Sequence, residues 1–88
     1  MKPLPNRREA TLALYQDLEE GSISLQEASK RMRRIIGKSQ TEYAKLIGIS
    51  TKSLMDFERG VSNPTLKTLE AIGKPFGLEV GYRKTRRG

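Results

Sequence analysis

The segment from Ser39 to Gly60 constrains the fold of this chain more than any other part of the sequence. Ser39 is followed three residues later by Glu42, which is the pattern of a capping box at the start of a helix. Gly48 would end that helix after about two turns, because glycine readily adopts the left-handed conformation that a tight turn requires. Ser50 suits the N-cap of a second short helix that stops at Gly60. The spacing therefore predicts short helices over residues 40–47 and 51–59, joined by a tight turn.

Two short helices joined by a turn that contains glycine form the outline of a helix-turn-helix motif. The residue types at four further positions agree with this outline. A small Ala44 lets the second helix approach closely, Gly48 makes the turn, and Leu54 and Phe57 would anchor the second helix on a core. Agreement at all four positions, with the capping residues in register, makes the motif a specific signal.

Apolar residues at helical spacing predict a helix before this motif and a second one directly adjoining it. The first helix covers residues 7–20, with Asn6 as N-cap and Gly21 as its stop. Its apolar face consists of Ala10, Ala13, Leu14 and Leu18. The second helix follows the capping box of Ser24 and Glu27 and ends at Gly37. Its apolar face consists of Leu25, Ala28, Met32 and Ile35.

The region after the motif predicts one more helix and then a strand. Thr65 starts the helix, Leu66, Leu69 and Ile72 face inward, and Gly73 and Pro75 end or kink it. Residues 78–82 alternate apolar and other side chains with a period of two, which predicts a short strand. A lone strand leaves backbone groups unpaired, so we expect it to pair with the same strand of a second subunit. The dimerisation residues would be Leu78, Val80 and Tyr82. The alternative is a frayed extended tail.

Charge is distributed unevenly along the chain, which has a net charge of +7 and an isoelectric point near 10.1. Basic residues cluster in and just after the predicted second helix and in the tail: Lys30, Arg31, Arg33, Arg34, Lys38, Arg83, Lys84, Arg86 and Arg87. Between Glu9 and Glu27 the charged residues are all acidic. Clustered bases are the electrostatic pattern of a nucleic-acid binder, because they neutralise phosphates and release counterions. The alternative is that these side chains lie on solvated helix faces.

Composition excludes several classes of function. The chain has no cysteine and no histidine, so disulfides, thiolate or histidine zinc sites and Ser-His-Asp or Cys-His catalysis are excluded. Gly37-Lys38-Ser39 ends like a phosphate-binding loop, but Met32 stands where that motif needs a glycine. We expect no enzyme activity, no cofactor and no metal. The sequence shows neither a signal peptide nor a membrane-spanning apolar run, so we expect a soluble, cytoplasmic protein.

The motif resembles the helix-turn-helix DNA-binding domains of the Xre/Cro/C1 family. The residues that carry the resemblance are Gln40–Arg59, Gly60, Asn63–Leu66, Leu69 and Gly77–Leu78. The resemblance implies an all-α, lambda-repressor-like domain over residues 24–77, after an N-terminal extension over residues 1–23 and before a strand and basic tail over residues 78–88. Within the family, the C-terminal strand resembles that of HipB-type antitoxin-repressors, whose tail strands pair across a dimer. Residues 7–20 are an addition that the resemblance does not cover.

The resemblance also implies positions for the DNA contacts. The helix from Ser50 would be the recognition helix, with Thr51, Lys52, Ser53 and Asp56 facing base edges or phosphates. Gln40 would clamp a phosphate through its amide and backbone N–H, with further phosphate contacts from Ser39, Arg59 and Asn63. Arg33 and Glu58 would form a partly buried ion pair. Asp56 has three open roles: it accepts from a cytosine amino group, orients Lys52, or repels phosphate.

The function implied is that of a homodimeric repressor that binds an inverted-repeat operator in double-stranded DNA and regulates its own gene. The partner implied by the HipB-type resemblance is a cognate toxin such as a HipA-type kinase, with this chain as the antitoxin. Two alternatives stay open: a protein-interaction module that neutralises a partner without reading DNA sequence, and a phage-type repressor with no toxin. The helix over residues 7–20 would either dock a basic partner or pack on the domain.

Overall fold

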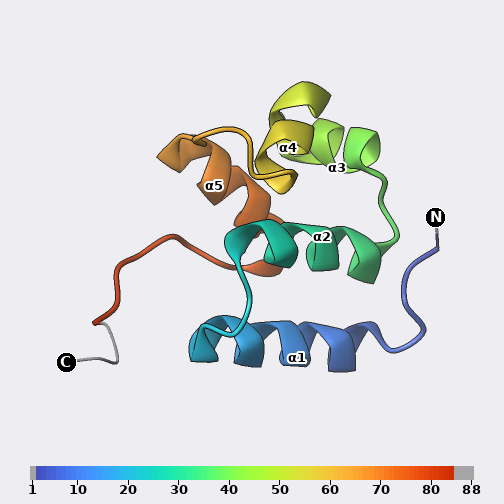
Figure 1. The fold of residues 1–88 in the computed structure, drawn as a ribbon. Helices are drawn as coiled ribbons and strands as arrows, with labels where there is room; N and C mark the ends of the chain where they lie inside the picture. The colour runs from blue at the N-terminus through green and yellow to red at the C-terminus, as the bar shows by residue number, and fades with distance from the viewer. Residues whose placement is uncertain (1, 85–88) are drawn as a thin grey trace.

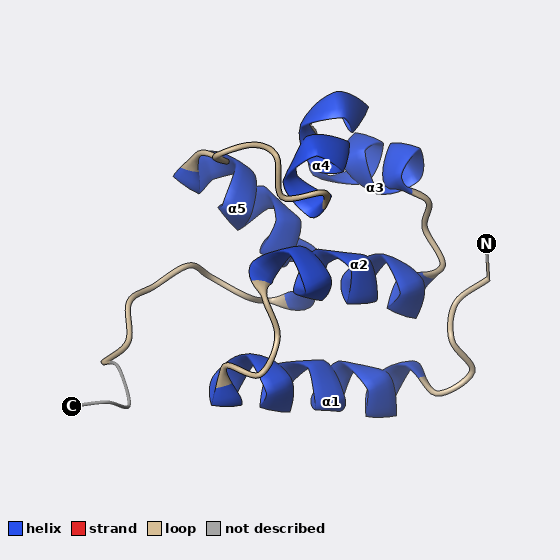
Figure 2. Ribbon diagram, in the orientation of Figure 1, coloured by secondary structure: helices blue, strands red, loops and turns tan. Residues whose placement is uncertain are grey.

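The computed structural model describes residues 2–84, which contain five α-helices, one short 3-10 helix and no strand (Figures 1 and 2). The elements are α1 (Arg7–Glu20), α2 (Leu25–Ile36), α3 (Gln40–Ile47), α4 (Thr51–Glu58), α5 (Leu66–Gly73) and η1 (Lys74–Phe76). The sequence therefore predicted the helices correctly. Arg86 and Arg87 of the basic tail lie outside the described residues.

The helices are arranged around α2. Figure 1 shows α1 running alongside one face of α2, with α3 and α4 on the opposite side; α5 is drawn to the left of α4 and leads into η1. The turn between α3 and α4 has Gly48 in the left-handed conformation, with φ of 79°. The N–H groups of Gly48 and Ile49 both donate to the Ala44 carbonyl, at 2.9 Å and 3.0 Å. These two hydrogen bonds fix the direction in which α4 leaves α3.

Hydroxyl groups at the helix starts explain why the helices begin where they do. Ser24, Ser39, Ser50 and Thr65 each accept a hydrogen bond from the backbone N–H three residues later. At Ser39 the capping box is complete, because the Glu42 carboxylate accepts from the Ser39 N–H at 2.9 Å. Asn6 is the N-cap of α1, as predicted, but its side chain makes no capping hydrogen bond with the described residues.

The core gathers side chains from all five helices and η1. Its buried apolar residues are Leu14, Ala28, Met32, Ile35, Tyr43, Ala44, Leu54, Phe57, Ile72 and Phe76. Three residues predicted to face inward are exposed: Ala13, Leu25 (54%) and Leu66 (59%). Leu25 and Leu66 are the first residues of α2 and α5, and these helix ends lie outside the core. Ala13 is exposed because α1 packs mainly on α2, so a narrow apolar face is enough.

The expected strand over residues 78–82 is absent from the described part of the chain. Leu78 instead belongs to its own domain: its N–H donates to the Gly73 carbonyl at 3.1 Å and its side chain packs against the core. Val80 and Tyr82 are exposed. The physical reason is that a strand needs a second backbone to pair with, and a single copy offers none in residues 2–84.

Among residues 2–84, no helix combines the length and the apolar character that crossing a bilayer requires.

A buried tyrosine that the sequence did not single out joins α3 to the end of α5. The Tyr43 hydroxyl donates to the Ile72 carbonyl at 2.6 Å, and burial raises the pKa of this tyrosine. We predict that Tyr43→Phe lowers the free energy of unfolding by about 1–2 kcal/mol, because a buried carbonyl loses its partner. Urea denaturation of the variant measures the loss. Tyr82→Phe removes an exposed hydroxyl and serves as the control; an equal loss in both variants would contradict the prediction.

Candidate nucleic-acid interface

The two faces of α4 are chemically different. Leu54 and Phe57 are fully buried and fix the helix on the core. The opposite face carries Lys52, whose side chain is 84% exposed, together with exposed Ser53 and Met55. A short helix with an apolar face held by the core and a polar face in solvent is suited to enter the major groove of DNA.

The residues at the start of α4 form a small hydrogen-bonded set. The Lys52 ammonium lies 3.0 Å from an Asp56 carboxylate oxygen one turn later, so in the free chain Asp56 orients Lys52. This contact corresponds to one of the three roles left open for Asp56. The Ser50 hydroxyl donates to the Ser53 hydroxyl at 2.8 Å and accepts from the Ser53 N–H. Thr51 is half-buried beside them.

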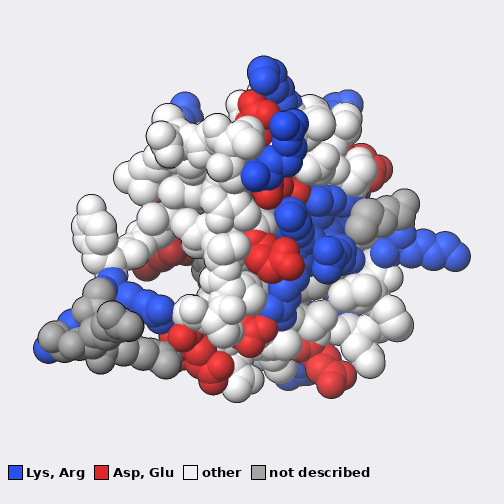
Figure 3. All heavy atoms as spheres, in the orientation of Figure 1, with Lys and Arg blue, Asp and Glu red and all other residues white. Residues whose placement is uncertain are grey.

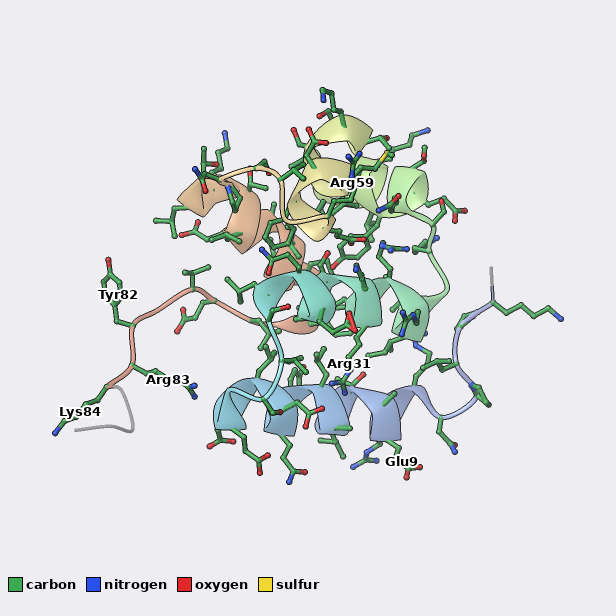
Figure 4. All side chains as sticks on the ribbon, in the orientation of Figure 1. Glu9, Arg31, Arg59, Tyr82, Arg83 and Lys84 are labelled. Carbon is green, nitrogen blue, oxygen red and sulfur yellow. The ribbon has the colours of Figure 1, made fainter. Side chains whose placement is uncertain are left out.

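The residues predicted to contact phosphate differ in how accessible their side chains are. Arg59, which follows α4 as its C-cap, is exposed (Figure 4). Asn63 is exposed as well. The Ser39 hydroxyl oxygen is engaged in the capping box. The Gln40 amide donates to Glu58 Oε1 at 3.1 Å, so it points into the protein rather than outward as expected. The Ser39 hydroxyl accepts from the Glu42 N–H, so the N–H groups of Gln40 and Thr41, at the start of α3, are the donors left for a phosphate at this position.

A buried carboxylate lies directly behind the interface. Glu58, at the end of α4, is 3% exposed. Arg33 of α2 binds it through two nitrogens, with Nη2 2.7 Å from Oε1 and Nε 2.9 Å from Oε2. The Ser29 hydroxyl donates to Oε2 at 2.7 Å. With the Gln40 amide, three side chains from α2 and α3 therefore hold the last residue of α4, and we call these four residues the Glu58 network.

The charge of Glu58 depends on these donors. Burial on its own would raise the pKa of the Glu58 carboxyl. The hydrogen bonds from Arg33, Ser29 and Gln40 outweigh that effect and hold the pKa below its ordinary value of 4.5. The carboxylate is therefore ionised at neutral pH, as a bidentate pair with a guanidinium requires.

The sequence indicated Arg33 and Glu58 through the family resemblance, but it missed Ser29 and the inward direction of Gln40. A signal for Ser29 exists. It lies next to Ala28 and three residues before Met32, which places a polar side chain on the core face of α2. A buried hydroxyl needs a partner, so the position itself indicated a buried polar contact.

Basic side chains are concentrated on the surface of the two-helix motif. Figure 3 shows basic side chains gathered in the centre and at the top, over α2, α3 and α4, with a few acidic side chains among them, whereas several acidic side chains line the lower edge, over α1. The exposed basic residues of α2 to α4 and the residue after α4 are Arg34, Lys45, Lys52 and Arg59. The positive face therefore coincides with the exposed face of the two-helix motif. Within residues 2–84, no group of three or more acidic side chains is arranged to hold a metal ion.

Removing Arg33 leaves the Glu58 charge buried without its cation. We predict that Arg33→Met lowers the free energy of unfolding by about 3 kcal/mol, at the lower end for a broken buried pair because Ser29 and Gln40 still donate. Arg34→Met removes the same charge from an exposed position of α2 and is the control. Thermal and urea denaturation compare the two variants. Equal stability of both would show that the Arg33–Glu58 pair does not contribute to the free energy of unfolding.

The Glu58 network also predicts a dependence on pH. The pKa of the Glu58 carboxyl is lower in the folded protein than in the unfolded chain. The stabilisation that the ionised carboxylate provides is therefore present above about pH 4.5 and is lost as the pH falls through the folded pKa. The difference in unfolding free energy between wild type and Glu58→Gln should thus be largest at neutral pH and shrink in acid. Urea titrations between pH 7 and pH 3 measure it, and a difference independent of pH would contradict the assignment.

Comparison with known proteins places the motif in a family. A family model described as helix-turn-helix matches residues 30–83, more than half of the chain, including α3, α4 and α5. Neither the search of curated proteins nor the search of solved structures gave a match. Domains of the matched family are DNA-binding regulatory domains and are generally non-enzymatic. With residues 30–83 matched and the two-helix motif formed as described, the chain belongs to the Xre/lambda Cro-like helix-turn-helix family of DNA-binding transcription regulators.

Proposed function

We propose that this protein is a sequence-specific transcriptional repressor that binds an inverted-repeat operator as a homodimer and represses its own gene. The observation that carries the proposal is the position of α4. Its apolar side and its last residue are held by the core and by the Glu58 network, while Lys52 and Ser53 project from the basic face. A recognition helix needs this combination, because base edges are read only by side chains whose backbone is fixed.

In this mechanism α4 enters the major groove and the side chains of Thr51, Lys52 and Ser53 meet base edges. Asp56, one helical turn after Lys52, accepts a hydrogen bond from the Lys52 ammonium, so that Lys52 approaches the bases in one orientation. The first turn of α3 donates backbone N–H groups to a phosphate, and Arg59 and Asn63 add phosphate contacts. The net charge of +7 supplies the sequence-independent part of the affinity. Binding over the promoter then blocks polymerase.

A homodimer explains how so small a reading surface achieves specificity. Two copies place two α4 helices in successive major grooves, about one turn (~34 Å) apart, on an inverted repeat. The dimerisation residues predicted from the sequence were Leu78, Val80 and Tyr82. Leu78 is committed to its own core, which leaves Val80 and Tyr82 as the side chains available for a second copy.

Lys52 is the most direct test of base reading. Selection from a random pool of duplexes supplies a preferred sequence, and gel-shift titration measures the affinity of each variant for it and for scrambled DNA. We predict that Lys52→Ala weakens binding to the preferred sequence by about 1–3 kcal/mol and changes binding to scrambled DNA much less. The control is Lys67→Ala, which removes an exposed lysine from α5. An equal loss on both kinds of DNA would assign Lys52 to a phosphate and contradict its role in reading.

A second candidate function is that of an antitoxin, which would hold a toxin such as a HipA-type kinase in addition to repressing the operon. The observation that favours it is α1, which lies outside the matched residues and exposes Leu12 and the acidic Glu19 and Glu20. The test expresses the product of the neighbouring reading frame with and without this chain. Growth arrest relieved by the wild type, but not by a variant with Leu12→Ser, Glu19→Gln and Glu20→Gln, would support this role. If the neighbouring product causes no growth arrest, the antitoxin function is refuted and the repressor function is the one that remains.

A further inference from the structure

The segment that precedes α1 is folded against the end of α2. The Leu4 N–H donates to the Ile35 carbonyl at 3.3 Å. The last carbonyls of a helix have no partner within that helix, so this hydrogen bond satisfies a group that α2 leaves open. We call residues 2–5 the N-terminal arm. The arm lies outside the residues 30–83 that the family model matches, so its position is a feature of this chain rather than of the matched motif.

A glycine lets the N-terminal arm approach α2 this closely. Gly37 is the C-cap of α2, is buried, and has the left-handed φ of 68°. A Cβ added at Gly37 would overlap backbone atoms of Lys2 and Pro3. Glycine therefore serves both the left-handed turn and the close approach of a second backbone. The arm and the turn between α2 and α3 are in direct contact as a result.

This contact places the N-terminal arm beside the start of α3. Gln40 follows Gly37 by three residues, and three residues of chain span at most about 11 Å. Figure 1 shows the arm rising from the start of α1 past the end of α2, on the side of the molecule where α3 begins. The N–H groups of Gln40 and Thr41 are the phosphate donors of the proposed function. The arm is therefore adjacent to the DNA backbone that those donors would bind.

Two lysines lie at this contact, and their charges differ in how far they are compensated. Lys38 is half-buried and is close enough to Glu42 to act on it: hydrogen bonds with Ser39 lower the pKa of the Glu42 carboxyl, and the charge of Lys38 adds to that effect. Lys2 is exposed and forms no ion pair with an acidic side chain of residues 2–84. Lys2 is thus the cation of the arm that is available to an anion from outside.

We propose that the N-terminal arm is a second DNA-binding element, in which Lys2 binds a backbone phosphate next to the one held by the first turn of α3. The proposal rests on the DNA binding of the proposed function and gives the segment before α1 a task in it. Because the backbone of the arm is already fixed, Lys2 binds with less loss of conformational freedom than a lysine on a free tail. A phosphate contact strengthens binding to every sequence and positions the protein on the duplex, but it reads no base.

The salt dependence of DNA binding counts phosphate contacts. Lys2→Ala should reduce the slope of the logarithm of the binding constant against the logarithm of the salt concentration by about 0.9, equally on the preferred sequence and on scrambled DNA. Lys2→Arg keeps the charge and should keep the slope. The matched control is Lys84→Ala, which removes an exposed lysine that Figure 4 shows on the side of the molecule opposite the arm. Its slope should equal that of the wild type.

Three results of these titrations would overturn the proposal. An unchanged slope for Lys2→Ala would mean that Lys2 meets no phosphate. Equal reductions for Lys2→Ala and Lys84→Ala would mean that each lysine acts only through the net charge of the protein. A loss of affinity confined to the preferred sequence would assign Lys2 to a base. Helix content by circular dichroism and urea denaturation control for folding, and both sites are exposed.

A single cysteine tests the position of the arm, because the chain contains none of its own. An iron–EDTA chelate attached to Lys2→Cys should cleave the bound duplex, whereas the same chelate on Lys84→Cys should not. On the preferred sequence the cuts should fall within a few nucleotides, because the arm is held on α2 by Gly37 and Leu4. Cleavage spread over more than a helical turn would indicate a free tail, and absence of cleavage would place the arm away from DNA; either result would contradict the proposal.

The salt slope on scrambled DNA does not depend on sequence reading, so it separates this inference from the proposed function. A slope reduced by Lys2→Ala, in a protein that binds all DNA sequences equally, would support the arm contact and refute the sequence-specific repressor. Sequence-specific binding with a slope that Lys2→Ala leaves unchanged would support the repressor and refute the arm contact.

Discussion

A buried carboxylate determines how the parts of this domain are joined. Glu58 ends α4, and its partners come from α2 and α3, so the three helices meet at one charge. Burying an ionised carboxylate is unfavourable unless hydrogen bonds replace the lost water. Four donor atoms from Arg33, Ser29 and Gln40 do so here. These donors hold the end of α4 against α2 and α3, while Leu54 and Phe57 hold its apolar side on the core, so the polar face of α4 is directed outward.

The rest of the molecule supports that arrangement from two sides. Tyr43 ties α3 to the end of α5 within the core, and α1 covers the face of α2 away from the motif. The helix α1 also reaches the C-terminal segment through Tyr15 and Glu19. It thus adds apolar burial to a small domain and fixes the segment that we assign to the dimer contact, two tasks that the matched region does not perform on its own.

Local features made the helices predictable from the sequence. A serine or threonine at each helix start from α2 to α5 and a glycine at the ends of α1, α2 and α3 act within a few residues, so their effect can be read without the fold. The Glu58 network was less accessible. Ser29 and Gln40 lie 29 and 18 residues from Glu58, and no local pattern sets which side chain meets a charge at that distance. Gln40 was accordingly expected to face outward.

The C-terminal segment shows a different limit. Its alternation of apolar residues is a real pattern, but a strand exists only when a second backbone lies beside it, and sequence periodicity does not say where that backbone comes from. In one copy, Leu78 packs into the core and Val80 and Tyr82 remain exposed. The same residues therefore form no strand alone and carry the contact that we propose between copies.

The most direct measurement of the central claim is a footprint of the purified protein on the DNA upstream of its own gene, at low and high salt with random competitor DNA. A dimeric repressor should protect a symmetric site with half-sites about one helical turn (~34 Å) apart, and this protection should be retained at the higher salt. Diffuse protection that disappears as salt rises would mean that the basic face binds phosphate without reading sequence, and would contradict the account.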